Sequence, residues 1–264
     1  MRKSTAAAAL ILGLSFAADA WAQGEGLGVR ARRWRSRIDG DFQADNSLLA
    51  GTNFDLRATA DMDEEIDIND FGASFAFPGL GKVNLQFWEG SFWGETTLGQ
   101  DVVLDGTTFT GGTPVDTTLD CKVGSILFEY SSRPPAMFAG NAFAFQTGLK
   151  SINIKGEFES ALDRQESAVK GYLPALGMHG RITVGQYLSV EVEANALFAE
   201  AFEMSGLSGT FYDAAVSGQF TMSGFYAGLG YRWFRIEAED ERGGDKTQVD
   251  ASIQGAFLEI GYKM

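Results

Sequence analysis

The residue with the widest range of possible chemistry is the only histidine of the chain, His179. A histidine exchanges protons near neutral pH, so next to a carboxylate it can act as the general base of a hydrolase. His179 stands in a segment of alternating residues, shortly before the turn-forming pair Gly185-Gln186 and on the same face as Arg181. We expect it to make hydrogen bonds among charged neighbours inside the protein, and we expect no enzymatic activity.

An acidic run from Asp61 to Asp70 has carboxylates at alternate positions, which raises the question of a calcium site. An EF-hand loop needs Gly at its sixth position and a carboxylate at its twelfth. Counted from Asp61, these positions hold Ile66 and Gly72, so the motif fails. We interpret the run as a solvated loop, with weak binding of divalent cations as the alternative.

Motifs for other cofactors are also missing from the sequence. A single cysteine, Cys121, can form neither an internal disulfide nor a cysteine zinc site. The chain contains no Gly-x-Ser-x-Gly, Walker or His-Glu-x-x-His pattern. We therefore expect no metal and no cofactor.

The first 22 residues have the three parts of a secretory signal peptide. Arg2 and Lys3 give a positive start, residues 6–16 are mostly apolar, and Ala20-Trp21-Ala22 is a small-x-small cleavage site. The apolar stretch is shorter than the roughly 20 residues that a spanning helix needs. We expect a cleaved signal peptide at 1–22 and a single domain at 23–264.

Composition favours strands and excludes some partners. The chain has 33 Gly and 21 Phe but only 5 Pro, a mixture suited to strands and turns. Its net charge of -14 argues against nucleic acid as a partner. After residue 23 no stretch is apolar over 18 residues, so helical membrane spans are not expected. A transmembrane β-barrel would pass unnoticed, because only alternate residues of its strands face lipid.

Alternation of polar and apolar residues predicts ten strands, and eight strands is the alternative. The ten predicted strands are 28–43, 71–77, 83–98, 115–131, 142–158, 170–184, 188–200, 211–222, 225–239 and 247–263. Short connections (78–82, 131–135, 185–187 and 223–224) alternate with long polar ones (44–70, 99–114, 159–169, 201–210 and 240–246). This alternation is typical of bacterial outer-membrane barrels, whose short turns face the periplasm and whose long loops face outside. The prediction is an all-β, closed antiparallel transmembrane barrel in the cell outer membrane, with both termini periplasmic.

Each predicted strand has two distinct faces. In 188–200 the even positions are apolar while the odd positions include Glu191 and Glu193; in 115–123 the odd positions are mainly apolar and the even ones include Lys122. We expect the apolar faces to contact lipid and the polar faces to line a narrow interior. Several strands change phase, as at Ile126 after Ser125, which we interpret as bulges or as strand ends beyond the bilayer.

Five arginines crowd the first strand, and a basic side chain facing lipid at the bilayer midplane costs roughly 2 to 4 kcal/mol. We expect Arg30 and Arg32 to lie near the periplasmic interface, where long side chains can extend to water. The remaining three share one face and are expected to project inward. The predicted interior charge network comprises Arg33, Arg35, Arg37, Lys122, Lys150, Glu191, Glu193, Arg232 and Glu259.

Together with the signal peptide and the ten strands, the last strand resembles the small outer-membrane β-barrel proteins of Gram-negative bacteria, of OmpA-like or OmpW-like architecture. It ends Phe257-Leu258-Glu259-Ile260-Gly261-Tyr262-Lys263-Met264. The resemblance covers the mature chain and implies contact with outer-membrane lipids and lipopolysaccharide, insertion by the barrel-insertion machinery, and a monomer. These families usually end in an aromatic residue, whereas this chain ends in Met264.

Three functions remain open at this stage. The first is a structural or interaction barrel whose external loops bind a partner and whose charged lumen is plugged. The second is a narrow porin-like channel for small solutes. The third, disfavoured, is a barrel hydrolase like the omptin proteases or the lipid A deacylases. Those enzymes pair a histidine with acidic residues at the outer rim, and His179 is predicted in the opposite half. Since a barrel of eight strands is filled by side chains and ten strands is close to that limit, we favour the first.

Overall fold

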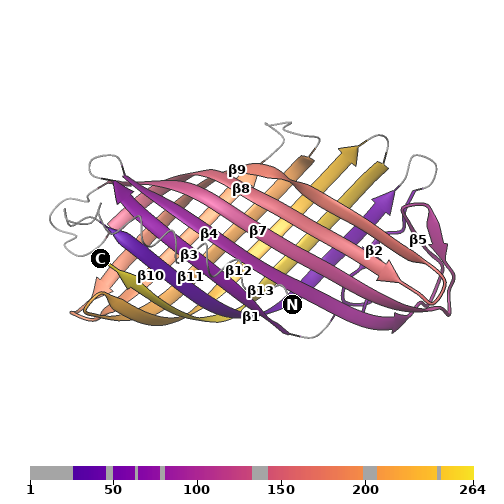
Figure 1. The fold of residues 1–264 in the computed structure, drawn as a ribbon, viewed down its shortest axis with the longest axis horizontal. Helices are drawn as coiled ribbons and strands as arrows, with labels where there is room; N and C mark the ends of the chain where they lie inside the picture. The colour runs from indigo at the N-terminus through magenta and orange to yellow at the C-terminus, as the bar shows by residue number, and fades with distance from the viewer. Residues whose placement is uncertain are drawn as a thin grey trace, which may run out of the picture.

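The fold is a closed antiparallel β-barrel (Figure 1), seen in a computed structural model that describes residues 26–45, 50–62, 65–77, 81–132, 142–198, 207–242 and 245–264. The predicted signal peptide lies outside these ranges. Within them, no helix has the length and apolarity needed to cross a membrane.

Ten strands of the described part form the barrel wall, and the last pairs with the first to close it. In order around the barrel they are β1 (Leu27–Asp45), β3 (Ile66–Phe77), β4 (Gly81–Thr97), β7 (Pro114–Ser132), β8 (Ala142–Glu159), β9 (Arg164–Val184), β10 (Leu188–Phe198), β11 (Leu207–Met222), β12 (Phe225–Arg242) and β13 (Asp245–Lys263). The predicted strand number and closure are confirmed.

Three short strands, β2 (Phe54–Asp55), β5 (Val102–Leu104) and β6 (Thr107–Phe109), lie together at one end of the barrel (Figure 1), which we call the cap end. The opposite end, the base end, holds Leu27, Lys263 and the turn at Ser223 and Gly224. Both Ser223 and Gly224 have positive φ, as the type I′ two-residue hairpin turn requires.

Strands continue into segments that the sequence analysis assigned to long loops. At the cap end β8 ends at Glu159 and β9 begins at Arg164, while β12 ends at Arg242 and β13 begins at Asp245. The predicted loops at 159–169 and 240–246 are therefore mostly strand. Their polar residues indicated loops, but a strand whose outer face meets water is polar on that face too.

On the base half of the barrel the outer surface is apolar. Large exposed apolar side chains occur on every wall strand except β1, among them Phe71, Phe87, Ile126, Phe145, Leu176, Val190, Phe220, Leu229 and Ile260. On β9 this belt runs over twelve residue steps, from Val184 to Tyr172. At about 3.3 Å per residue and a tilt of about 45°, that is a height of about 28 Å, close to the roughly 30 Å of a bilayer's hydrocarbon core.

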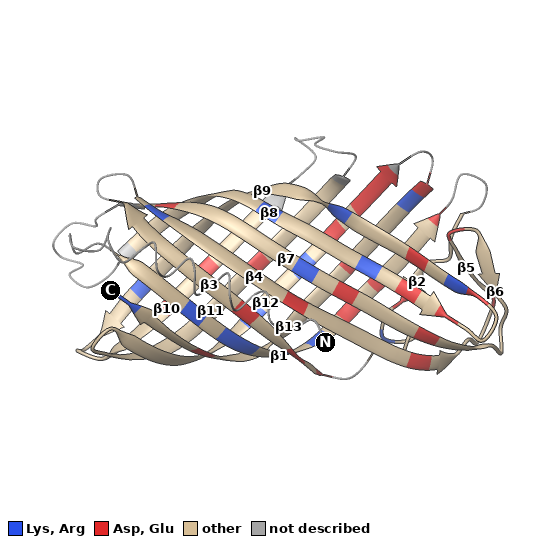
Figure 2. Ribbon diagram, viewed as in Figure 1, with Lys and Arg blue, Asp and Glu red and all other residues tan. Residues whose placement is uncertain are grey.

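Toward the cap end the two faces of the wall exchange character. On β7 the inward residues run from Glu129 and Ser125 near the base to Cys121 and Leu119 near the cap, while the outward ones change from Ile126 to Asp120. Figure 2 shows the change as charged segments on the outer strands toward β2 and β5. The pairing of β7 with both neighbours is unbroken, so the bulge, the first of the two interpretations of this phase change, is wrong. The phase change instead marks the level at which the outside becomes water and the inside becomes an apolar core.

The cap end is closed by segments that fold over this core. Phe54, Leu56 and Met62 are buried there, and so are Val102 and Phe109 of the β5–β6 hairpin. Backbone hydrogen bonds hold both segments, from Leu56 N to Gly40 O at 2.8 Å and from Thr52 N to Val103 O at 2.7 Å. The interior at this end is therefore mainly apolar, with a few polar side chains such as Asp240 and Thr247 buried near the ends of β12 and β13.

Candidate functional site

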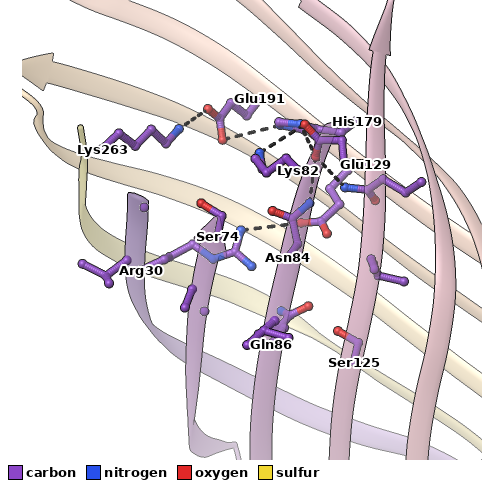
Figure 3. Close-up of a pocket in the computed structure, with 18 of the residues that line it drawn as sticks. Arg30, Ser74, Lys82, Asn84, Gln86, Ser125, Glu129, His179, Glu191 and Lys263 are labelled. Carbon is purple, nitrogen blue, oxygen red and sulfur yellow. Dashed lines mark hydrogen bonds and ion pairs between the residues drawn. The ribbon is translucent and has the colours of Figure 1, made fainter. Parts of the chain in front are cut away.

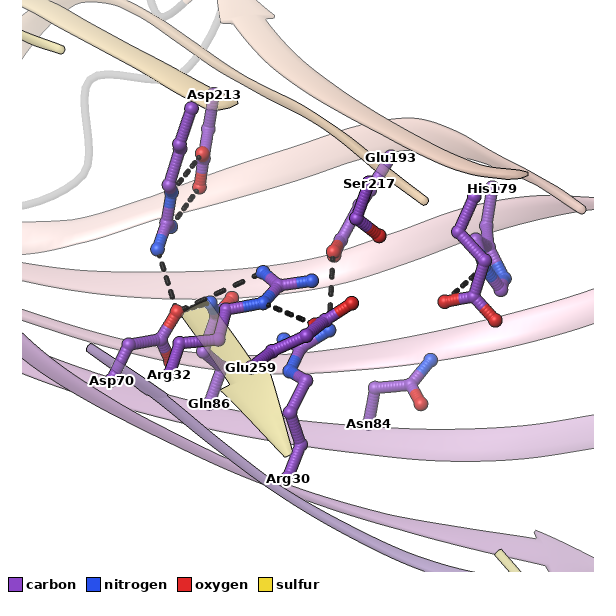
Figure 4. Close-up of polar contacts among 12 residues, drawn as sticks. Arg30, Arg32, Asp70, Asn84, Gln86, His179, Glu193, Asp213, Ser217 and Glu259 are labelled. Atoms are coloured by element: carbon purple, nitrogen blue, oxygen red, sulfur yellow. Dashed lines mark hydrogen bonds and ion pairs between the residues drawn. The ribbon is translucent and has the colours of Figure 1, made fainter. Parts of the chain in front are cut away.

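Arg232 on β12 is the centre of a buried charge network inside the barrel. It donates to the two carboxylate oxygens of Asp213 at 2.8 Å each and to Asp70 at 2.8 Å. Lys150 binds Asp213 from another wall strand, and all four side chains are buried. Because each carboxylate is shared between cations, the contacts join β3, β8, β11 and β12 across the lumen. Figure 4 shows Asp70 and Asp213, the two carboxylates that are shared.

A second chain of contacts extends this network toward the base end. Arg32 donates from Nε to Glu259 at 2.9 Å. Gln219 donates to Glu259 at 2.7 Å and to Glu191 at 2.8 Å, and Lys263 donates to Glu191 at 2.7 Å. We call the set Arg32, Asp70, Lys150, Asp213, Arg232 and Glu259 the ion network.

Aromatic rings separate the ion network from the apolar core. The Arg232 guanidinium lies 5.1 Å from the ring centroid of Trp34 and 5.6 Å from that of Trp88. Arg32 lies 4.6 Å from the Phe257 ring. These distances allow cation–π attraction, so the rings stabilise the cations. The same rings are also the first layer of the apolar core.

Between the ion network and the base end lies a polar cavity of about 70 Å³, which has room for a few water molecules. Its walls include Arg30, Lys82, Glu129, His179 and Glu191 (Figure 3). His179 Nδ1 lies 3.4 Å from Glu129, and Nε2 lies 3.9 Å from Glu191. A recess of about 320 Å³ lined by several of the same side chains leads on toward the chain ends. The cavity and the recess together form a polar pocket in the base half of the barrel.

Both ring nitrogens of His179 face carboxylates, one from β7 and one from β10. From its place on β9, His179 thus lies between Glu129 and Glu191 inside the barrel. This is the charged interior neighbourhood that the sequence predicted for it.

Five members of the predicted charge network line the interior. These are Lys150, Glu191, Glu193, Arg232 and Glu259. Direct contacts join Lys150 and Arg232 through Asp213, and Glu191 and Glu259 through Gln219.

The expectation that Arg33, Arg35, Arg37 and Lys122 project inward is wrong. All four are exposed on the outer surface, where Arg33 pairs with Asp67 at 2.5 Å. The inward positions of β1 hold Arg32, Trp34 and Ile38 instead. The assignment failed because it placed these strands entirely in lipid, whereas Arg33 to Arg37 and Lys122 lie at the edge of the apolar belt or beyond it, where charged side chains can reach water.

Sequence reasoning missed several interior charges. Arg30 and Arg32 were expected at the interface, and Asp70, Asp213 and Glu129 were not singled out. Arg30 instead lies 3.6 Å from Glu193 inside the barrel. One signal was available in the sequence of β11. Asp213 shares a strand face with Phe211 and Ala215, while the other face presents Tyr212 and Ala214, which suit lipid, so Asp213 should have been assigned to the interior.

The acidic run begins in a loop and continues as strand. Ile66 to Asp70 belong to β3, and Asp67 and Glu65 face outward to Arg33 and Arg35. Asp63 and Glu64 lie outside the described residues.

Carboxylates also gather at the cap end, on the outer side of the wall. Asp41 is paired in register with Asp250 on β13 and with Asp55 on β2. Partial burial and the neighbouring carboxylates raise the pKa of Asp41. A raised carboxyl pKa means that ionisation of Asp41 at neutral pH costs stability, a cost that falls as the pH drops.

Comparisons with known proteins agree on the fold alone. No family model matches the chain, and no curated protein matches it. Among solved structures, the outer membrane protease OmpT from Escherichia coli aligns with a TM-score of 0.56 at 9% identity, over 92% of this chain and 98% of that one. The resemblance to outer-membrane β-barrels expected from the sequence is therefore confirmed for the fold.

A weaker likeness is to the transport unit of the autotransporter AIDA-I from Escherichia coli, with a TM-score of 0.39, 10% identity and 97% of each chain covered. Another is to Ail, the attachment invasion locus protein of Yersinia pestis, with a TM-score of 0.32, 8% identity, and coverage of 91% of this chain and 99% of that one. These two add nothing to the assignment.

Proposed function

We propose that this chain is an exported outer-membrane protein whose filled barrel is a scaffold, with the cap end outside the cell as its interaction surface. The apolar belt and the barrel fold support the membrane location. In this proposal the first 22 residues are removed on export, the base end with both termini faces the periplasm, and the protein is not an enzyme.

The filled interior is the observation that carries the proposal. The ion network crosses the lumen within the belt, aromatic rings cover it, and an apolar core continues to the cap. Water and ions need a continuous polar path, and a layer of closely packed apolar side chains interrupts it. A channel function is therefore disfavoured, and the working surface moves to the part of the barrel that projects into water.

Electrical recording tests the filled interior. Purified protein inserted into a planar bilayer should give no stepwise conductance under an applied potential, because the apolar core blocks ion passage. Insertion is checked separately by heat-modifiable gel mobility of the same sample. Regular conductance steps from inserted protein would refute the scaffold function and favour the channel.

Cysteine labelling tests the proposed orientation. Leu162 lies at the exposed cap-end turn between β8 and β9, and Tyr187 lies in a base-end turn. In intact cells, Leu162→Cys should react with a membrane-impermeant maleimide and Tyr187→Cys should not. The native Cys121 is fully buried, so it adds no background. The reverse labelling pattern would place the base end outside.

A further inference from the structure

The outer surface of β1, β13 and β12 carries a compact group of cations at the edge of the apolar belt. Arg37, Gln254 and Trp233 share one row across the three strands. Arg35 faces outward one row nearer the base, and Arg235 one row nearer the cap. Neighbouring strands are about 4.8 Å apart and successive outward residues about 7 Å apart. The three guanidinium groups therefore flank Gln254 at the scale of one lipid headgroup.

This group adjoins lipid-facing residues directly. In the row below Arg35, which holds Arg33 on β1, Leu258 and Leu229 of the next two strands lie side by side and are 59% and 65% exposed. On the cap side of that row, the rings of Trp233 and Tyr231 contact each other at a tilt, with centroids 4.5 Å apart, and such aromatic pairs suit the level where a bilayer meets water. A lipid with its acyl chains over Leu258 would hold its headgroup at the arginines.

The cations are available to an anionic ligand. Arg37 is exposed and makes no ion pair with any described residue. Arg35 pairs with Glu65 at 2.6 Å, and Arg235 pairs with Glu237 at 2.8 Å and with Asp250 at 3.1 Å. The side chains in these surface pairs are 45–72% exposed, and exposed pairs contribute less than about 1 kcal/mol, so a phosphate can replace the carboxylates. Arginine binds phosphate with two parallel hydrogen bonds.

We propose that Arg35, Arg37 and Arg235, with Gln254 and Trp233 between them, form a binding trough for a phosphate-bearing lipid headgroup whose acyl chains lie over Leu258. The inference rests on the proposed membrane location and names the lipid chemistry at one place on it. The trough would also fix how deeply this side of the barrel sits in the bilayer.

Lipid retention tests the trough. The wild type and the double variant Arg35→Gln/Arg37→Gln are reconstituted in phosphatidylcholine nanodiscs that contain lipid A, and retained lipid A is measured by native mass spectrometry after a detergent wash. We expect the variant to retain about tenfold less, since each cation near a membrane surface contributes to binding anionic lipid. Lipid A stripped of its phosphates should be retained poorly by both proteins.

A matched control removes the same charge farther from the belt. Lys155→Gln/Arg164→Gln changes two ion-paired cations of β8 and β9 near the cap end, one partly exposed and one exposed, and should retain lipid A like the wild type. Equal retention by both double variants would overturn the trough, as would inorganic phosphate displacing lipid A completely. Failure of every variant and of the wild type to enter nanodiscs would instead overturn the membrane location, and the trough with it.

Discussion

Replacing Asp213 by Asn will lower the free energy of unfolding by about 3–5 kcal/mol, the usual cost of breaking a buried ion pair from one side. Asp213 holds both Arg232 and Lys150, and each of these cations is at most 2% exposed. The amide leaves Arg232 with Asp70 but leaves Lys150 without a countercharge. Urea unfolding followed by heat-modifiable gel mobility measures the loss.

Two further variants separate this effect from the loss of any carboxylate. Asp67→Asn removes the same charge from an exposed pair with Arg33 and should cost less than about 1 kcal/mol. In the Asp213→Asn background, Lys150→Met should restore part of the stability, because it removes the stranded cation and places an apolar chain beside Phe211. A loss below about 1 kcal/mol for Asp213→Asn would show that the ion network does not hold the barrel together.

Replacing Trp88 by Ala should cost about 3–5 kcal/mol, because it opens a cavity where the aromatic layer meets the ion network. Trp88 is fully buried and packs edge-on against Trp34 at 5.7 Å and Phe234 at 5.1 Å between ring centroids. The midpoint of thermal unfolding in detergent, read by loss of near-ultraviolet circular dichroism, reports the change.

Trp93 on the same strand provides the control. It faces outward and is 51% exposed, so Trp93→Ala should change stability by no more than about 0.5 kcal/mol. Equal destabilisation by both substitutions would mean that the inward and outward faces of β4 are assigned incorrectly. That result would also contradict a core between the ion network and the cap.

The alternation of residues was sufficient to predict the strands, because a strand presents its side chains to two sides in strict turn. It identified ten wall strands and their closure, and on β10 it placed Glu191 and Glu193 inside. There the strand lies wholly within the apolar belt, so polar residues are inward throughout. Lys150 and Arg232 were assigned for the same reason, and they too lie within the belt.

The direction of each face was decided by the tertiary structure. Arg33 on β1 and Lys122 on β7 share the alternation of interior residues elsewhere, yet both face outward. Period-2 patterning separates the two faces of a strand but does not show which face points outward. The polar residues lie on the inner face within the bilayer and on the outer face beyond it. The level of that reversal depends on strand tilt and on neighbouring strands.

The partners inside the barrel also depend on closure. Arg232 meets Asp70, far away in sequence, only because β12 and β3 lie on walls of one narrow lumen. By itself the sequence determined the strands, their number and their two-faced character, since these follow from local geometry. Which face points inward, which charges meet and what fills the cap end were decided by the closed barrel, because each depends on the environment that the whole wall creates.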